Sequence, residues 1–152
     1  MPDIGHIVNT THVGELDGIA GADAHLGRPM PYPKAPLPLV RWSRVHAISP
    51  DGAEIEWNLD DTREGAPGRL ALYAGFAPPP HRDWPGDDPP REVAVGDGRG
   101  TWREAELLEA EPSLRPAVEL SWHAHGWELR LTGQGPWEPT QLLAIAASVG
   151  PS

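Results

Sequence analysis

The stretch VELSWHAHGWELRLTGQGPWEPTQLLAIAASV, residues 118–149, decides the expected fold. Its first half contains two runs in which apolar and polar residues alternate, a pattern typical of strands that are buried on one face only. The apolar members of the two runs are Val118, Leu120 and Trp122, then Trp127, Leu129 and Leu131. Because the two runs follow each other closely along the chain, we expect an antiparallel hairpin.

The loop of this hairpin must contain an even number of residues, because a slip of one residue would set each apolar row against a polar one. We expect a four-residue loop over residues 123–126, which pairs Trp122 with Trp127. The same register places Glu119 opposite Arg130 on the outer face, where the two charges form a favourable cross-strand pair.

The second half of the stretch predicts a helix that begins at Pro139 and ends before Gly150. Proline suits the first turn of a helix because its missing N–H would have no partner there, and glycine is common just after the last turn. One apolar stripe has helical spacing and is formed by Leu142, Ile145, Ala146 and Val149. The stripe indicates a helix that packs against the sheet.

This stretch also resembles the end of an uncharacterised bacterial domain family, found at the C-termini of membrane-associated, sporulation-related and anti-sigma-factor-like proteins. The residues that carry the resemblance are Trp122, Gly126, Leu129, Leu131, Gly133, Leu142, Leu143, Ile145, Ala146 and Ser148. The resemblance implies a lipoprotein-carrier-like fold, a curved antiparallel sheet with helices on one face. Glu128 stands where that family has an aromatic residue, and the family has no established catalytic residues to carry over.

Alternation predicts further strands at residues 53–59 and 70–74, and strands are also expected at residues 44–49 and 92–95. The segment 101–110 allows two interpretations, because Thr101 and Glu104 form a capping-box pattern typical of a helix, whereas a continuing meander requires a strand, which we expect. The predicted fold class is α+β: an antiparallel β-sheet of five to six strands, a meander between Val40 and Thr132, with a C-terminal helix packed on one face.

We expect two parts in the chain: an N-terminal arm, irregular and Pro-rich, over residues 1–36, and a single α+β domain over residues 37–152. Helical spacing occurs between residues 10 and 26, but glycines there cost a helix about 1 kcal/mol each relative to alanine. Residues 28–38, RPMPYPKAPLP, are typical of an extended segment.

The charge balance excludes several classes of partner. The chain has 22 acidic and 12 basic residues, a net charge of −10, and no cysteine. Binding of nucleic acid or of an anionic membrane surface depends on clustered Lys and Arg, so neither is expected. Disulfides and thiolate chemistry are excluded. Because residues 1–20 lack the pattern of a signal peptide and no transmembrane run is present, we expect a cytoplasmic protein without membrane insertion.

Two groups of potential metal ligands are interpreted as solvated side chains. His123 and His125 are two residues apart, as ligands on one strand face are, but a third ligand is missing. The proline-rich segment 76–91 brings together His81, Asp83, Asp87 and Asp88. Gly96 to Gly100 lacks the spacing of a phosphate-binding loop and predicts a turn. We therefore predict no metal, no cofactor and no catalytic residue.

The aromatic residues give the main functional hypothesis. The chain has seven tryptophans and one phenylalanine. Trp84, Trp102 and Trp137 fall in loops or on an ambiguous element, and Phe76 opens the proline-rich segment, so these four are predicted to contact a ligand. The predicted function is a non-catalytic binding or interaction module that holds an apolar small molecule or a protein partner.

An alternative is a small hydrolase that uses carboxylate and histidine chemistry on a sugar or ester substrate. It requires that His46, His81 or His123 meets a carboxylate in a cleft. Glu54 and Glu56 lie two apart on one strand and form a potential carboxylate pair, which we expect to be solvated on an acidic outer face. A third hypothesis is a homodimer in which the N-terminal arm wraps a second copy.

Overall fold

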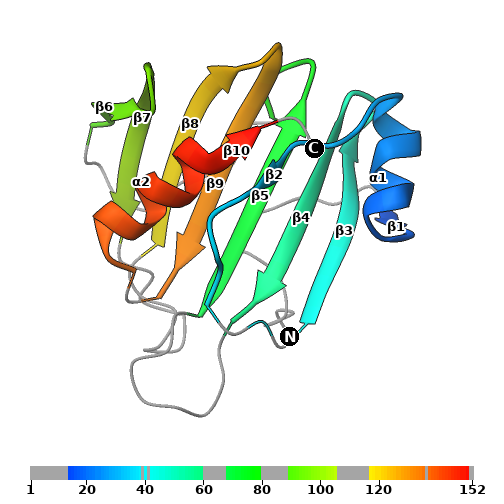
Figure 1. Ribbon diagram of the computed structural model, residues 1–152, viewed down its shortest axis with the longest axis horizontal. Coiled ribbons are helices and arrows are strands. Elements are labelled where there is room, and N and C mark those ends of the chain that lie inside the picture. Colours follow the sequence, from blue (N-terminus) through cyan, green and yellow to red (C-terminus); the bar gives the residue numbers. More distant parts are fainter. Residues whose placement is uncertain are drawn as a thin grey trace.

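The computed structural model describes residues 14–38, 40, 42–59, 68–79, 89–105, 117–135 and 137–150. The strands are β1 (Gly14–Leu16), β2 (Tyr32–Pro33), β3 (Trp42–Ser49), β4 (Gly52–Asn58), β5 (Arg69–Gly75), β6 (Arg91–Val95), β7 (Gly98–Ala105), β8 (Ala117–Ala124), β9 (Trp127–Gln134) and β10 (Val149–Gly150). The helices are α1 (Gly18–Leu26) and α2 (Pro139–Ser148). Figure 1 shows one large sheet with both helices on the same face.

The large sheet has eight antiparallel strands in the order β1-β3-β4-β5-β9-β8-β7-β6. The predicted α+β class, the antiparallel sheet and the C-terminal helix are confirmed. The predicted count of five to six strands is wrong, and the meander is interrupted. Strands β3 to β5 and strands β6 to β9 each form a meander, and the two join because β5 pairs with β9. The strand expected after residue 101 is confirmed as far as Ala105, and residues 106–110 lie outside the described residues.

The β8–β9 hairpin has a two-residue turn, so the predicted four-residue loop is wrong. His125 and Gly126 both have positive φ, 55° and 78°, which is the signature of a type I′ turn, whose twist matches that of the flanking strands. Ala124 therefore pairs with Trp127, and Trp122 pairs with Leu129. The register differs from the expected one by two residues, so every side chain stays on its expected face.

The apolar face of the sheet packs against α1 and α2. In α2, Leu142, Ile145 and Ala146 are buried, as the stripe predicted. Gly133 in β9 lets the helix approach closely, since a Cβ there would lie 3.2 Å from Leu142. On the same face, near the opposite edge of the sheet, α1 contacts β3 and β4, and Ala22 is among the residues that it buries.

The N-terminal part of the chain is not irregular as predicted, because residues 14–36 contain β1, α1 and β2. The helix α1 ends at Leu26 and is capped by Gly27, which has a φ of 77°. Asp23 accepts a hydrogen bond from the backbone N–H of Met30 at 2.8 Å. The cap at Gly27 and the hydrogen bond between Asp23 and Met30 depend on single residues, so they leave no periodic pattern in the sequence. The division of the chain near residue 36 stays a prediction.

An extended segment, residues 28–35, crosses the apolar face between the two helices (Figure 1); we call it the strap. Its strand β2 pairs with β10, directly after α2. The side-chain oxygen of Ser148 accepts hydrogen bonds from the backbone N–H groups of Lys34 and Ala35, at 3.0 and 2.9 Å. At the start of the strap, the Arg28 guanidinium lies 3.9 Å from the centre of the Trp127 ring.

The second face of the sheet is polar and, contrary to the expectation of a solvated outer face, its part on β4 and β5 is buried. Glu54 and Glu56 are both fully buried there. Arg130 Nη2 lies 3.7 Å from Glu54 Oε2, and His46 Nε2 lies 3.5 Å from Glu56 Oε1. Burial of a carboxylate is tolerated when basic groups and hydrogen bonds compensate for the lost water. The alternation identified the face correctly, but it carries no information about what covers that face.

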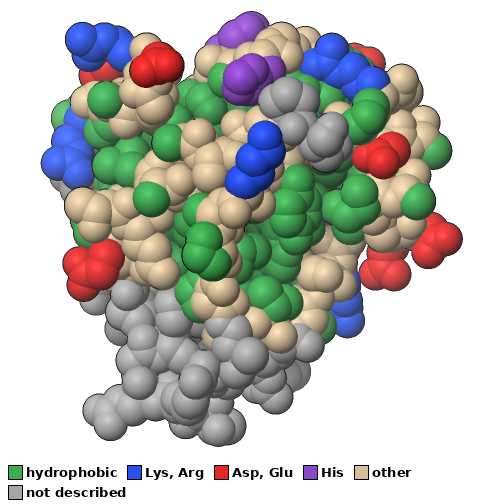
Figure 2. Space-filling model, viewed as in Figure 1, with side chains coloured by type: hydrophobic (Ala, Val, Ile, Leu, Met, Phe, Trp, Pro, Cys, Tyr) green, Lys and Arg blue, Asp and Glu red, His purple; other side chains and the backbone are tan. Residues whose placement is uncertain are grey.

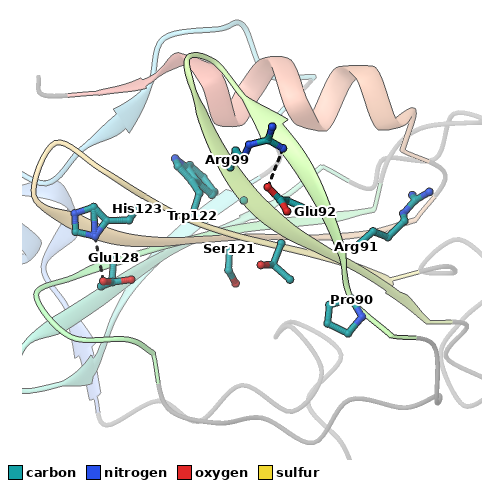
Figure 3. A pocket seen from close by; sticks show the side chains of 10 residues that line it. Pro90, Arg91, Glu92, Arg99, Ser121, Trp122, His123 and Glu128 are labelled. Atoms are coloured by element: carbon teal, nitrogen blue, oxygen red, sulfur yellow. Dashed lines mark hydrogen bonds and ion pairs between the residues drawn. The ribbon is translucent and has the colours of Figure 1, made fainter.

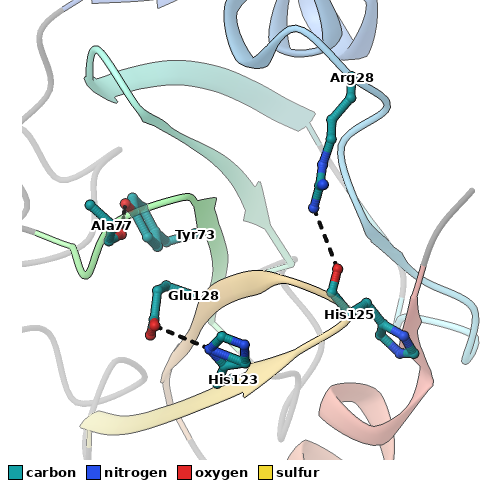
Figure 4. Close-up of polar contacts among 6 residues, drawn as sticks. All are labelled: Arg28, Tyr73, Ala77, His123, His125 and Glu128. Carbon is teal, nitrogen blue, oxygen red and sulfur yellow. Dashed lines mark hydrogen bonds and ion pairs between the residues drawn. The ribbon is translucent and has the colours of Figure 1, made fainter.

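Tyr73 is buried on the polar face, where its ring packs against two glycines. Its hydroxyl group donates a hydrogen bond to the backbone oxygen of Ala77 at 2.7 Å (Figure 4). Burial raises the pKa of Tyr73, although a hydrogen bond with Ser49 acts in the opposite direction. A Cβ at Gly52 would lie 2.5 Å from the Tyr73 ring. Glycine is therefore required at position 52 for steric reasons.

We predict that Gly52→Ala lowers the free energy of unfolding by about 1–3 kcal/mol, the usual cost of overpacking. The midpoint of thermal unfolding should fall by roughly 2–4 °C for each kcal/mol. Calorimetry measures this shift. Gly98→Ala is the matched control, because a Cβ at position 98 would meet its nearest atom at 3.7 Å. Equal stabilities of the two variants would contradict this explanation.

We predict that Ser148→Ala loosens the strap without unfolding the sheet. Each lost hydrogen bond contributes about 1 kcal/mol, so the amide of Ala35 should exchange with solvent roughly five times faster or more. Hydrogen-exchange measurements by NMR can compare this amide with the amides of β4. Thr140→Ala, an exposed position of the same helix, should leave the exchange of Ala35 unchanged; an equal effect of both substitutions would argue against the strap contact.

Candidate functional site

A pocket of about 290 Å³ lies on the helix-covered face, between α1 and the strap; we call it the apolar pocket after its floor. Its floor is formed by Val45, Ile55 and Trp57, which are buried residues of the sheet. The remaining lining residues are Glu15, Leu16, Asp17, Gly18, Ile19, Tyr32, Ser43 and Arg44. Figure 2 shows hydrophobic side chains at the surface over β4, in the region between the strap and α1.

Two exposed hydrophobic residues stand at opposite sides of this pocket. Ile19, in the first turn of α1, is 39% exposed, and Tyr32 of the strap is 38% exposed. The Tyr32 ring meets the Trp57 ring edge to face, with the ring centres 5.8 Å apart. Large apolar side chains exposed beside a recess commonly mark a binding site. The sequence did not identify these residues as candidates, because the helical spacing around Ile19 carries no functional signal and Tyr32 lies in a proline-rich segment without a period.

The polar groups of the apolar pocket lie at its edge. Glu15 and Asp17, the neighbours of Leu16 in the sequence, are exposed, and the side chain of Asp17 makes no capping hydrogen bond to α1. The Arg44 guanidinium lies 4.8 Å from the centre of the Trp42 ring. Charges of both signs therefore surround an apolar floor, an arrangement that suits a ligand with an apolar body and a polar end.

A second recess of about 570 Å³, the polar hollow, lies over strands β6 to β9. It is lined by Pro90, Arg91, Glu92, Arg99, Gly100, Thr101, Ser121, Trp122, His123 and Glu128 (Figure 3). Arg99 Nη1 lies 2.8 Å from Glu92 Oε1. Arg91 Nη2 lies 3.3 Å from Oε2 of Glu104, which is outside the lining. The hollow is larger and more open than the apolar pocket, and charged side chains line both recesses.

His123 and Glu128 form a pair in the polar hollow. The Nδ1 atom of His123 lies 3.2 Å from Oε1 of Glu128 (Figures 3 and 4), and the side chains are 64% and 35% exposed. The two residues are direct partners in the β8–β9 ladder. The four-residue loop expected from sequence would have put Ser121 opposite Glu128, so the wrong loop length concealed this pair.

Three of the four predicted ligand-binding residues lie in the described part of the chain, and these three do not share a recess. Trp102 and Trp137 are buried in the core, and Trp137 Nε1 donates a hydrogen bond to the backbone oxygen of Arg69 at 3.1 Å. Phe76 is exposed and stacks on Trp127, with ring centres 4.9 Å apart. Trp84 lies outside the described residues. None of the other three lines the apolar pocket or the polar hollow.

Of the potential metal ligands, the two that the structure describes, His123 and His125, have different surroundings. His123 points toward Glu128, and His125 is in the turn, where its backbone oxygen accepts a hydrogen bond from Arg28 Nη2 at 3.4 Å (Figure 4). Among the described residues, no three His, Asp or Glu side chains are placed to hold a metal ion. His81, Asp83, Asp87 and Asp88 lie outside the described residues.

Comparisons with protein-family models, with curated proteins and with solved structures find no significant match to the chain. The resemblance of residues 118–149 to a bacterial family therefore stays a prediction. In the part of the chain that the structure describes, neither helix is long and apolar enough to cross a membrane. The proposals below depend on the geometry of the two recesses.

Proposed function

We propose that the protein is a binding module that holds a small apolar molecule in the apolar pocket, with no catalysis at that pocket. The observation that carries the proposal is the recess over Ile55 and Trp57, flanked by the exposed side chains of Ile19 and Tyr32. A bound apolar group would cover these side chains and remove them from water, which contributes about 25 cal/mol for each Å² of apolar surface.

The size of the pocket limits the ligand. Pockets for small molecules commonly have volumes of ~300–1,000 Å³, so 290 Å³ is at the small end of this range. The ligand is accordingly a short aliphatic chain or a single ring system rather than a two-chain lipid. Binding on the face between sheet and helix also agrees with the lipoprotein-carrier-like fold that the resemblance implies.

A small molecule fits this site better than a protein partner does. A stable protein interface buries about 800 Å² on each partner, whereas this pocket is a narrow recess with two exposed hydrophobic residues at its sides. A protein partner, or a second copy bound through the N-terminal segment, remains the alternative. It would require a larger apolar surface than the described residues of the pocket provide.

We predict that the neutral fluorescent probe N-phenyl-1-naphthylamine binds saturably and is displaced by octan-1-ol. Ile19→Asn and Tyr32→Ser should each weaken binding about tenfold, or about 1.4 kcal/mol, because each removes part of the apolar contact. Fluorescence titration measures both affinities. These side chains are partly exposed in the free protein, so the variants should fold.

The matched control is Val40→Asn. Val40 is 41% exposed and does not line the pocket, so this variant should bind the probe as the natural sequence does. Absence of saturable binding, or equal weakening in all three variants, would contradict the proposed function.

A further inference from the structure

We propose that the polar hollow is a hydrolytic site in which His123 is the catalytic base, Glu128 is a positioning residue and the substrate is a small polar ester. This activity is separate from the binding of an apolar molecule, because the polar hollow and the apolar pocket share no lining residue. The proposal depends on the geometry of the His123–Glu128 pair.

Glu128 determines which nitrogen of His123 can act as a base. Because Glu128 Oε1 lies 3.2 Å from Nδ1, the carboxylate favours the tautomer in which Nδ1 carries the proton and donates it in a hydrogen bond. The lone pair of Nε2 is then available. A histidine oriented in this way by a carboxylate is the arrangement that many hydrolases use for general-base catalysis.

Two hydroxyl groups lie on the same face of the sheet as this base. Ser121 is two residues before His123 on β8 and therefore on the same face, and Thr101 of β7 is the direct partner of Ser121. Both line the polar hollow, and Figure 3 shows Ser121 between the His123–Glu128 pair and Arg91. Their O–H groups can donate hydrogen bonds to an oxygen that gains negative charge in the reaction.

The charges of the hollow define the substrate class. Arg99 and Arg91 are each neutralised by a carboxylate, at 2.8 and 3.3 Å, so the hollow has no excess of positive charge for a phosphate. Trp122 and Pro90 are its largest apolar lining residues. A small ester with polar substituents fits this lining, whereas a long acyl chain would not be covered.

The reaction is the hydrolysis of the ester by water. Nε2 of His123 takes a proton from a water molecule as the water oxygen bonds to the carbonyl carbon, and the carbonyl electron pair moves to the carbonyl oxygen. That oxygen accepts hydrogen bonds from Thr101 and Ser121. The electron pair on that oxygen then re-forms the carbonyl double bond, and the bond from carbon to the alcohol oxygen breaks. The alcohol oxygen takes the proton from Nε2. The products are a carboxylic acid and an alcohol.

Hydrolysis of p-nitrophenyl acetate by the full chain tests the proposal. We expect His123→Asn to lower kcat/KM about 100-fold or more, the usual contribution of a general base, and added imidazole to restore part of the rate. His125→Asn is the matched control, because asparagine tolerates the positive φ of the turn and His125 does not line the polar hollow. It should keep the natural rate.

Glu128→Gln should lower kcat about tenfold and leave KM unchanged, since it affects the orientation of the base rather than binding, and Glu128→Asp should recover part of this loss. A purely structural role of Glu128 would not separate kcat from KM in this way. The proposal is overturned if His123→Asn keeps the natural rate, if His125→Asn loses as much activity, or if the protein is no faster than an equal concentration of free imidazole.

Discussion

The width of one apolar sheet face is the constraint on which the rest of the structure depends. Eight strands, about 4.8 Å apart, span roughly 34 Å, whereas two helices with their side chains cover only about 20–24 Å. The strap covers part of the remaining width, between α2 and α1 (Figure 1). The apolar pocket lies at a gap in this covering layer, between Tyr32 of the strap and Ile19 of α1.

The strap therefore holds N-terminal and C-terminal elements of the chain together at the proposed binding site. Ser148 and β10, next to the C-terminus, hold the segment that carries Tyr32, and Arg28 fixes its beginning on Trp127. The opposite wall of the pocket belongs to β1 and α1. Ile55 and Trp57, which form the floor of the pocket, also belong to the core. The strap and α1 therefore bound a recess whose floor is part of the packed sheet. The second face of the sheet contributes differently, through paired buried charges and, at its β7–β9 side, through the His123–Glu128 pair.

Alternation with period two was sufficient to predict β4, β5, β8 and β9, and the stripe of Leu142 and Ile145 predicted α2, because these elements bury one face against the core. The short elements β1, α1 and β2 were not predicted. Helical spacing is present in the region of α1, but its glycines argued against a helix, and the prolines around β2 leave no period. Periodicity also placed Glu54 and Glu56 on the correct face without showing that this face is buried. The His123–Glu128 pair depends on the length of the turn. Alternation cannot distinguish a two-residue turn from a four-residue turn, because both keep every side chain on the same face.

The most direct test of the central claim is an NMR titration of the 15N-labelled protein with octan-1-ol. Binding in the apolar pocket should shift the indole N–H signal of Trp57 and the amide signals of Ile19 and Tyr32 with one saturation curve. The indole signals of Trp102 and Trp137, in other parts of the core, should stay in place. Shifts confined to residues of the polar hollow, such as Ser121 and His123, or no saturable shift at all, would contradict the account.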